Sequence, residues 1–307
     1  MELFYSLDYI SPTPTVVALG CFDGVHLGHA DVIRNAKERA MMLGVSCTVW
    51  TFEEPPKNYF LPHSVPLITL QKEKQARIEA LGVDVLVCLP FDKAIKSMTA
   101  EDFFKTILHK RLRACHLICG YNYSFGAKGL GNPALLGTLC EEYGVGLTVV
   151  PPVSVGQTPV SSSAIRLAMA EGAPEQAAAM LGRPYSLTAP VVHGQQLARK
   201  LGFPTVNQIF PAGQLIPKAG VYATRVSLPN SEEVYRGISN VGIRPTVSDH
   251  TLCCETHVFD FSGDLYGAPI TVEFLSFLRP EQKFASVDAM SQQVKRDMEA
   301  VQEFFRK

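Results

Sequence analysis

The pattern of apolar and polar residues divides the chain into two parts of different character. In the first part, short and almost wholly apolar runs alternate with amphipathic stretches, the clearest of which has helical spacing over 28–43 and stops at Gly44. The apolar runs predict strands at 15–19, 46–52, 84–91, 116–121 and 146–152. Because buried strands separated by helices form sheets covered on both faces, we expect an α/β domain with a parallel sheet.

After about residue 182 the pattern becomes that of an all-β domain with one amphipathic helix, expected at about 286–305. Strand-like runs separated by Gly, Pro and Asn lie at 187–192, 221–228, 234–241, 253–261 and 270–277. Short antiparallel strands at this spacing are typical of a small barrel or sandwich. The boundary follows an alanine-rich helix at 174–181, so we expect domains at 1–182 and 183–307.

Length, charge and cysteine usage set broad limits on the class of protein. A chain of 307 residues can bury two separate cores, and its net charge of −1 offers no general attraction to nucleic acid or anionic membranes. No apolar run reaches the roughly 20 residues needed to cross a bilayer, and the N-terminus has no basic flank typical of a signal peptide. The eight cysteines fall mostly in apolar runs without zinc-type spacing. We therefore expect a reduced, cytoplasmic protein with buried thiols.

A dense polar stretch, GCFDGVHLGHAD at 20–31, joins the first predicted strand to the first predicted helix. Loops at the carboxyl edge of a parallel sheet are where ligands bind. Gly28 and His29 open a helix whose N-terminus favours phosphate, and the earlier glycines allow a tight turn. His26 and His29 are three residues apart, so both can donate hydrogen bonds to a phosphate as charge builds in a transition state. The bland alternative is a glycine-rich turn carrying two surface histidines.

A second polar stretch, VSSSAIR at 160–166, lies near the end of the predicted α/β domain. It combines three hydroxyl groups with Arg166, one helical turn beyond Ser163. Hydroxyl and N–H groups at a helix start, supported by an arginine, suit the phosphates of ATP. Taken alone, the stretch would be interpreted as a serine N-cap followed by a solvated arginine.

These two stretches resemble the HxGH nucleotidyltransferase superfamily, and the rest of the chain carries further motifs in a fixed order. They are LGFPTVN at 201–207, PKAGVY at 217–222, GISNVGIRPTV at 237–247 and ETHVFDFSGDLYG at 255–267. Together with the two earlier stretches, this series resembles the prokaryotic bifunctional riboflavin kinase/FAD synthetase family over nearly the whole chain.

The resemblance implies a Rossmann-like nucleotidyltransferase domain followed by a small antiparallel β-barrel of riboflavin kinase type with a terminal helix. The barrel would convert riboflavin and ATP to FMN and ADP. The first domain would join AMP from a second ATP to FMN, giving FAD and diphosphate. Both reactions need a divalent cation, usually Mg²⁺. ATP, riboflavin and FMN are the expected partners, with no nucleic acid and no membrane, and the oligomeric state is left open.

The resemblance also implies the residues of the kinase site. Thr205 and Asn207 match the Thr and Asn of the family's PTAN motif, which bind the metal and the nucleotide phosphates, and Gly202 belongs to the same stretch. Oxygen donors of this kind suit a hard cation. Glu255 matches the family's catalytic glutamate, which takes the proton from the ribityl 5′-hydroxyl. The segment 193–203 matches a loop near the ATP phosphates.

In the first domain the resemblance implies catalytic roles for His26, His29 and Arg166, and a flavin contact for Asn122. The expected ATP contacts are Gly20, Phe22, Asp23, Gly24, His26, Gly28, His29, Ser162, Ser163 and Arg166.

Four departures from the family pattern concern this first domain. The stretch TFEEPP at 51–56 lacks a histidine that is usual there, and Ser124 and Leu130 replace two arginines. Asn122 replaces an acid but still offers hydrogen bonds, whereas a serine cannot supply a charge. We therefore expect adenylyl transfer with an altered rate or affinity.

Two alternatives stay open at the level of the sequence. The chain would be a riboflavin kinase alone if the first domain has lost its activity, as the missing basic residues would favour. It would be a non-catalytic flavin- or RNA-binding regulatory module if neither site reacts, but such a module needs a basic groove with stacking aromatics. No strongly basic cluster occurs in the sequence.

Overall fold

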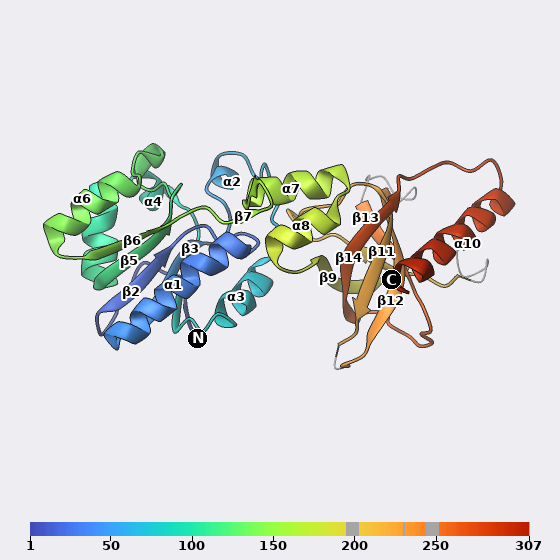
Figure 1. Ribbon diagram of the computed structural model, residues 1–307, viewed down its shortest axis with the longest axis horizontal. Helices are drawn as coiled ribbons and strands as arrows, with labels where there is room; N and C mark the ends of the chain where they lie inside the picture. Colours follow the sequence, from blue (N-terminus) through green and yellow to red (C-terminus); the bar gives the residue numbers. More distant parts are fainter. Residues whose placement is uncertain (195–202, 230, 244–251, 307) are drawn as a thin grey trace. The chain divides into compact units, whose positions relative to one another are not determined.

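The computed structural model describes residues 1–194, 203–229, 231–243 and 252–306 (Figure 1). Contacts divide the chain into two compact units, Met1–Ser162 and Ser163–Lys307. The first is an α/β unit and the second is a β-barrel with helices, as the apolar pattern predicted.

The first unit contains a six-stranded sheet in which every pairing is parallel. Its strands are β1 (Glu2–Phe4), β2 (Thr15–Leu19), β3 (Ser46–Phe52), β4 (Val85–Leu89), β5 (Ala114–Gly120) and β6 (Gly146–Val150). They lie in the order β1-β4-β3-β2-β5-β6. The chain runs from β2 through β3 to β4 in one direction and from β5 to β6 in the other. The switch of direction therefore falls between β2 and β5, where open sheets of this type bind ligands at their carboxyl edge.

Helices cover both faces of this sheet, because its central strands are apolar on both sides (Figure 1). One face packs against α1 (Leu27–Leu43) and α3 (Gln71–Glu79), with Val16 and Ala18 in the shared core. The other face packs against η1 (Phe103–Arg111) and α6 (Pro133–Tyr143) through Val17 and Leu19. The shorter helices are α2 (Lys57–Phe60), α4 (Lys93–Ser97), α5 (Ala100–Asp102) and η2 (Ala127–Gly129), and a small hairpin pairs β7 (Ser154–Val155) with β8 (Thr158–Pro159).

The second unit is a closed, antiparallel six-stranded barrel in the order β10-β13-β12-β11-β14-β9. Its strands are β9 (Tyr185–Val192), β10 (Val206–Ile209), β11 (Gly220–Ser227), β12 (Val234–Ile243), β13 (Leu252–Val258) and β14 (Pro269–Arg279). Helix α10 (Val287–Phe304) packs on the outside through Val301, and an ion pair of 2.7 Å joins its Asp297 to Arg279. Closure removes the exposed edges of the sheet.

Helices α7 (Ser162–Glu171) and α8 (Pro174–Leu181) precede the barrel, and α8 matches the helix predicted at 174–181. The backbone N–H of Lys218 donates to the carbonyl of Met169, so the end of α7 is joined to the barrel unit. The boundary between compact units thus precedes the functional boundary predicted at 182/183, which stays a prediction.

The strands expected from apolar runs are confirmed to within a few residues at their ends, whereas β1, β10 and the two-residue strands β7 and β8 were not predicted. β1 has three residues and is defined by its parallel pairing with β4. β10 contains the polar pair Asn207 and Gln208, so it has no apolar alternation, yet it closes the barrel by pairing with both β9 and β13. For β1 and β10 the pairing partners, rather than the local pattern, stabilise the strand.

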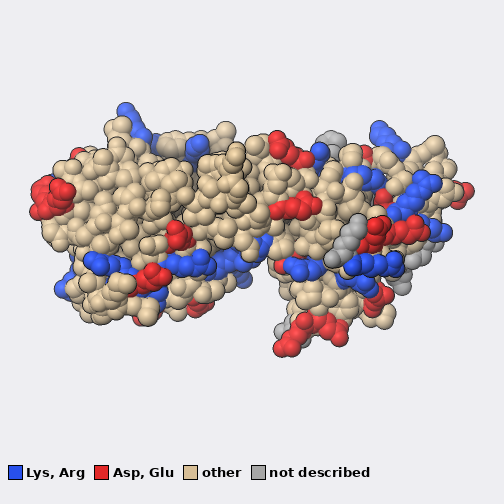
Figure 2. Space-filling view, in the orientation of Figure 1, with Lys and Arg blue, Asp and Glu red and all other residues tan. Residues whose placement is uncertain are grey.

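Surface and thiol chemistry agree with the balanced composition. On the face shown in Figure 2, basic and acidic side chains are interspersed over both units. All eight cysteines are free, and six of them are buried. Within the described residues, no helix is both long and apolar enough to span a membrane, and no three His, Cys, Asp or Glu side chains gather as a metal site.

Candidate functional site

The loop between β2 and α1 lies at the carboxyl edge of the sheet, beside the point where the strand order reverses. Its backbone is held in an unusual conformation: Phe22 has φ 50°, Gly24 has φ 84° and Val25 has φ 40°. A non-glycine residue with positive φ carries strain that surrounding contacts must offset. Gly20 is required for a different reason, because a Cβ there would lie 2.8 Å from the Phe22 ring.

His26 and His29 are brought together at the start of α1, as the sequence predicted. His26 is the N-cap of α1 and is buried, and its Nδ1 accepts a hydrogen bond from the backbone N–H of His29 at 3.1 Å. A neutral imidazole that accepts at Nδ1 carries its proton on Nε2, so Nε2 can donate to a ligand. The two rings stack with centroids 3.5 Å apart and 14° between their planes.

Asp23 supports the loop from below. Its carboxylate accepts hydrogen bonds from the backbone N–H groups of Ile68 and Thr69, at 3.0 and 3.2 Å, and the Thr69 hydroxyl accepts from the N–H of Gly24 at 3.0 Å. The Ser162 hydroxyl donates to the Asp23 carbonyl at 2.9 Å. The buried carboxylate thus ties the loop to the segment before α3. The ATP contacts predicted for Asp23 and Ser162 stay predictions beside these structural roles.

Asn122 follows β5 and so borders the same reversal point as the two histidines. Its side chain is exposed. Its Oδ1 lies close to Gly120, since a Cβ added to Gly120 would be 3.4 Å from that oxygen. Burial raises the pKa of the neighbouring Tyr123, so its hydroxyl stays protonated. Ser124 and Leu130, which replace the two arginines, are both exposed.

Ser163 and Arg166 belong to α7 in the second compact unit. The two histidines belong to the first unit, and the structure describes each unit by itself. The expected convergence of Arg166 with the histidines therefore stays a prediction.

An aromatic cluster of Phe52, Tyr59, Phe60 and Phe91, near the ends of β3 and β4 and on α2, was not identified from the sequence. Phe52 and Phe91 lie edge to face with ring centroids 5.2 Å apart, and Tyr59 contacts Phe91 at 5.7 Å. Phe60 is 63% exposed, and the Lys96 ammonium lies 5.0 Å from its ring centroid. Large exposed aromatic surface at a ligand-binding edge indicates a site for a flat ligand. The one signal in the sequence was the pair of adjacent aromatics after TFEEPP.

In the barrel, two of the predicted kinase residues, Asn207 and Glu255, lie on neighbouring strands. The register of β10 and β13 places Asn207 directly opposite Glu255, and β12 places Asn240 opposite Glu255 on its other side. Directly opposed residues of antiparallel strands project to the same face. Thr205 lies two residues before Asn207, and a bond of 2.8 Å from the His257 ring to the Pro204 carbonyl holds this segment against β13. Glu255 itself is partly buried.

The side chain of Asn207 is the most informative part of this site. Asn207 is 5% exposed, and its Oδ1 accepts no hydrogen bond from the part of the chain that the structure describes. A buried amide oxygen without a donor is costly unless a ligand or ion completes it. A Cβ on Gly194 would lie 2.5 Å from the Asn207 Nδ2, so the start of the predicted phosphate loop runs directly against this amide. Gly202 lies outside the described residues.

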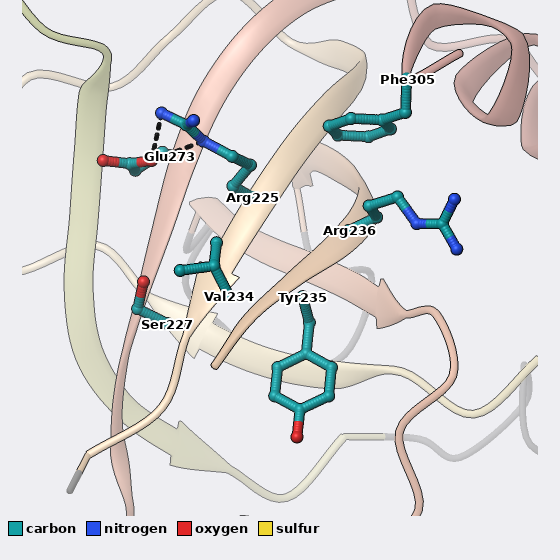
Figure 3. Close-up of a pocket in the computed structure, with 7 residues that line it drawn as sticks. All are labelled: Arg225, Ser227, Val234, Tyr235, Arg236, Glu273 and Phe305. Carbon is teal, nitrogen blue, oxygen red and sulfur yellow. Dashed lines mark hydrogen bonds and ion pairs between the residues drawn. The ribbon is translucent and has the colours of Figure 1, made fainter. Parts of the chain in front are cut away.

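A separate groove of about 510 Å³ lies elsewhere on the barrel (Figure 3). Its lining residues are Arg225, Ser227, Val234, Tyr235, Arg236, Glu273 and Phe305. Arg225 pairs with Glu273 at 3.0 Å and Arg236 with Asp260 at 2.8 Å, so the charges of both guanidinium groups are already balanced. Arg236 is four residues, or about 13 Å along an extended strand, from Asn240 of the kinase cluster. None of the predicted site residues lines this groove.

Comparison with known proteins assigns the two parts of the chain to two families. A family model for FAD synthetase matches residues 9–164, and one for riboflavin kinase matches residues 181–305. The chain is 35% identical to the bifunctional riboflavin kinase/FMN adenylyltransferase of Escherichia coli strain K12, covering 99% of this chain and 98% of the relative. The enzyme of the same name from Bacillus subtilis is 33% identical, covering 95% and 92%. A crystal structure of a macrolide-efflux protein from Streptococcus pneumoniae has a TM-score of 0.88 and 30% identity, covering 98% of both chains.

Proposed function

The chain belongs to the family of bifunctional riboflavin kinase/FMN adenylyltransferases, and we propose that residues 1–182 catalyse adenylyl transfer and residues 183–307 the kinase reaction. The enzyme makes FMN and ADP from riboflavin and ATP, and FAD and diphosphate from FMN and ATP. One observation carries the assignment of the kinase site: Asn207, whose buried Oδ1 accepts no hydrogen bond from the described residues, lies directly opposite Glu255.

In the kinase reaction, Glu255 acts as the general base. It takes the proton of the ribityl 5′-hydroxyl as the oxygen attacks the γ-phosphorus of ATP, and the bond to ADP breaks. Phosphoryl transfer needs mainly positioning and charge neutralisation, so a carboxylate held on a barrel strand is well suited to the task. Strand pairing on both sides, to Asn207 and Asn240, fixes the backbone that carries it.

The residues beside Glu255 fit a magnesium ion. The Oδ1 of Asn207 is a buried oxygen without a described donor, and Thr205, two residues earlier, carries a hydroxyl that could serve as a second oxygen ligand. Mg²⁺ prefers oxygen ligands and usually takes most of them from substrate phosphates and water, so two protein oxygens are sufficient. When bound, Mg²⁺ would neutralise phosphate charge. Asn207 and Thr205 would hold and orient the nucleotide there, with Gly194 allowing the loop to approach.

In adenylyl transfer, a phosphate oxygen of FMN attacks the α-phosphorus of the second ATP and diphosphate leaves. The Nε2–H of His26 and the ring of His29 donate hydrogen bonds to the phosphate oxygens, where negative charge grows in the transition state. The start of α1 adds backbone N–H groups and a positive dipole end. Arg166 and Ser163 complete this site in the proposal.

FMN is proposed to bind with its isoalloxazine ring on the aromatic cluster of Phe52, Tyr59, Phe60 and Phe91. Tyr59 and Phe60 of the cluster are exposed, the cluster lies at the sheet edge used by the histidine loop, and a flat ring can stack on such side chains. Asn122, across the reversal point, offers hydrogen bonds to the flavin. The loss of positive charge at positions 124 and 130 lowers the expected affinity for phosphate groups rather than for the ring.

The remaining parts of the proposal concern setting and partners. We place the enzyme in the cytoplasm, where its free thiols are stable, and we take ATP, riboflavin and FMN as its binding partners. Neither nucleic acid nor membrane is required for either reaction.

Chromatography of the products tests the whole assignment. The full chain is incubated with riboflavin, ATP and Mg²⁺, and FMN and FAD are followed separately over time. FMN should rise first and FAD should follow at its expense. If FMN forms from riboflavin but no FAD appears, even in a second incubation started with FMN and fresh ATP, the enzyme is a kinase without adenylyltransferase activity. The absence of both FMN and FAD would overturn the assignment.

A further inference from the structure

Lys74 is a buried lysine that contacts the histidine loop, and none of the sequence motifs includes it. It lies on α3 and is only 2% exposed. Its Nζ donates to the carbonyl of Cys21 at 3.1 Å and also to the carbonyl of Phe52. Ile78, one turn later on the same face of α3, is fully buried, so this helix directs Lys74 inward together with its apolar residues.

The two carbonyls that Lys74 binds belong to neighbouring strand ends at the binding edge. Cys21 is the second residue after β2 and precedes the strained Phe22, while Phe52 is the last residue of β3. The Thr51 hydroxyl donates to the same Cys21 carbonyl at 2.9 Å. Lys74 therefore joins the carboxyl ends of β2 and β3 just where the loop turns toward His26.

The start of α3 supports this loop at a second place. Asp23 binds the backbone of Ile68 and Thr69, immediately before α3, and Lys74 binds Cys21 from the first turn of the helix. The loop is thus held on both sides of Phe22, whose positive φ needs such support.

The charge of Lys74 has no carboxylate partner among the described residues: none of the ion pairs found there includes it. Lysine is rarely buried without a paired carboxylate, because removing its charge from water is costly. Carbonyl dipoles satisfy its hydrogen bonds but leave the net positive charge. A buried charge is poorly screened, so it acts strongly on an anion bound nearby.

We propose that Lys74 is a positioning residue for adenylyl transfer, which holds the histidine loop in its active conformation and supplies positive charge beneath the polyphosphate site. This proposal rests on the adenylyltransferase function proposed for the first unit. It also offers a reason why the enzyme functions with serine at position 124, because charge for the phosphates comes from below the loop instead.

The test compares Lys74→Met, Lys74→Gln and Lys74→Arg in the full chain. Methionine removes the charge and the donors, glutamine keeps a donor without charge, and arginine keeps both. Lys37→Met is the matched control, because Lys37 belongs to the same unit but pairs with Asp84, next to the amino end of β4, at 2.9 Å. The measurements are kcat and KM for FAD synthesis, and the affinities of the free protein for pyrophosphate and for FMN.

We expect Lys74→Met and Lys74→Gln to lower kcat/KM for ATP by roughly 10- to 100-fold, the usual size of a lost buried charged hydrogen bond. Pyrophosphate affinity should fall at least tenfold, while FMN affinity changes less than about threefold. Lys74→Arg should recover most of the pyrophosphate affinity, and the kinase rate should be unchanged in every variant. Fluorescence of Trp50, the chain's one tryptophan and a residue buried in the first unit, reports whether that unit is folded.

Pyrophosphate affinity at the wild-type level in folded Lys74→Met and Lys74→Gln would overturn the proposal, as would an equal loss in Lys37→Met. If Lys74→Met does not fold, the glutamine variant alone decides, since it keeps the tether and lacks the charge. A wild-type enzyme that makes FMN but neither forms FAD nor binds pyrophosphate would instead refute the proposed function of the first unit. The two failures are therefore distinguishable.

Discussion

Asn207 and Glu255 are direct cross-strand partners on β10 and β13, although they lie far apart in the sequence. Their side chains project to one face of the barrel, where Gly194, at the start of the predicted phosphate loop, lies against the asparagine amide. The pairing places the Asn207 amide, whose oxygen is the proposed metal ligand, next to the proposed base, Glu255. Kinase chemistry can therefore be tested at two adjacent positions with different expected effects.

Glu255→Gln should abolish FMN formation and leave FAD synthesis from supplied FMN nearly intact. Glutamine keeps the shape and the strand pairing but cannot accept the hydroxyl proton, and losing a general base costs on the order of 100- to 10,000-fold in rate. Separate assays of the two half-reactions check this. A kinase rate equal to that of the wild type would remove Glu255 from the catalytic role.

Asn207→Leu should raise the Mg²⁺ concentration needed for kinase activity far more than it weakens riboflavin binding. Leucine has a similar volume but lacks the oxygen that fits a cation, whereas Asn207→Asp keeps an oxygen and serves as the control. Mg²⁺ titrations of the kinase rate, with riboflavin affinity measured alongside, give the comparison. Equal losses in both quantities would indicate a structural role for the amide.

Replacing His26 and His29 together with alanine should lower the turnover of FAD synthesis much more than it weakens ATP binding. Donors that act on charge developing in the transition state contribute roughly 100-fold or more each. With riboflavin and ATP supplied, FMN should accumulate and FAD should nearly vanish. FAD formed at the wild-type rate would mean that the loop is only a glycine-rich turn.

Phe60→Ala should weaken FMN binding by roughly 10-fold, within the range measured for loss of one aromatic stacking partner. The matched control is Leu61→Ala, because Leu61 is adjacent and similarly exposed but is not aromatic. FMN affinity is measured by quenching of flavin fluorescence. An equal effect of both substitutions would argue against stacking on the aromatic cluster.

The first unit should lose stability as the pH falls below about 6.5, because His116 is buried as a neutral ring. Burial lowers the pKa of His116, with the nearby Arg39 adding to the effect, and its Nε2 lies 2.8 Å from the Thr148 hydroxyl. The unfolded chain takes up the proton at higher pH than the folded one, so stability is fully present above 6.5 and is lost as pH falls toward the folded pKa.

His116→Gln should flatten this dependence. The measurement is thermal unfolding followed by Trp50 fluorescence at pH 7.5 and at pH about 5.5. The wild type should lose more of its Tm than the variant over this interval. Parallel losses in the two proteins would assign the acid sensitivity to other groups.

The sequence by itself determined those features that depend on local spacing. Apolar runs and amphipathic spacing marked the central strands and α1, because burial on two faces imposes a pattern that is visible in short windows. His26 and His29 were predictable as a pair for the same reason: three residues at a helix start bring two side chains together, whatever surrounds them.

Only the tertiary structure decided the features that depend on register and packing. Asn207 meets Glu255 because the barrel closes with one particular strand register, which no local pattern encodes. Lys74 belongs to a polar helical stretch in which a lysine would ordinarily face water, and its burial follows from how α3 docks beneath the loop. The hydrogen bonds from the backbone of Ile68 and Thr69 to the Asp23 carboxylate likewise have no signal in the sequence. Local order is set by near neighbours along the chain, whereas these contacts arise only when distant segments pack and their polar groups must find partners.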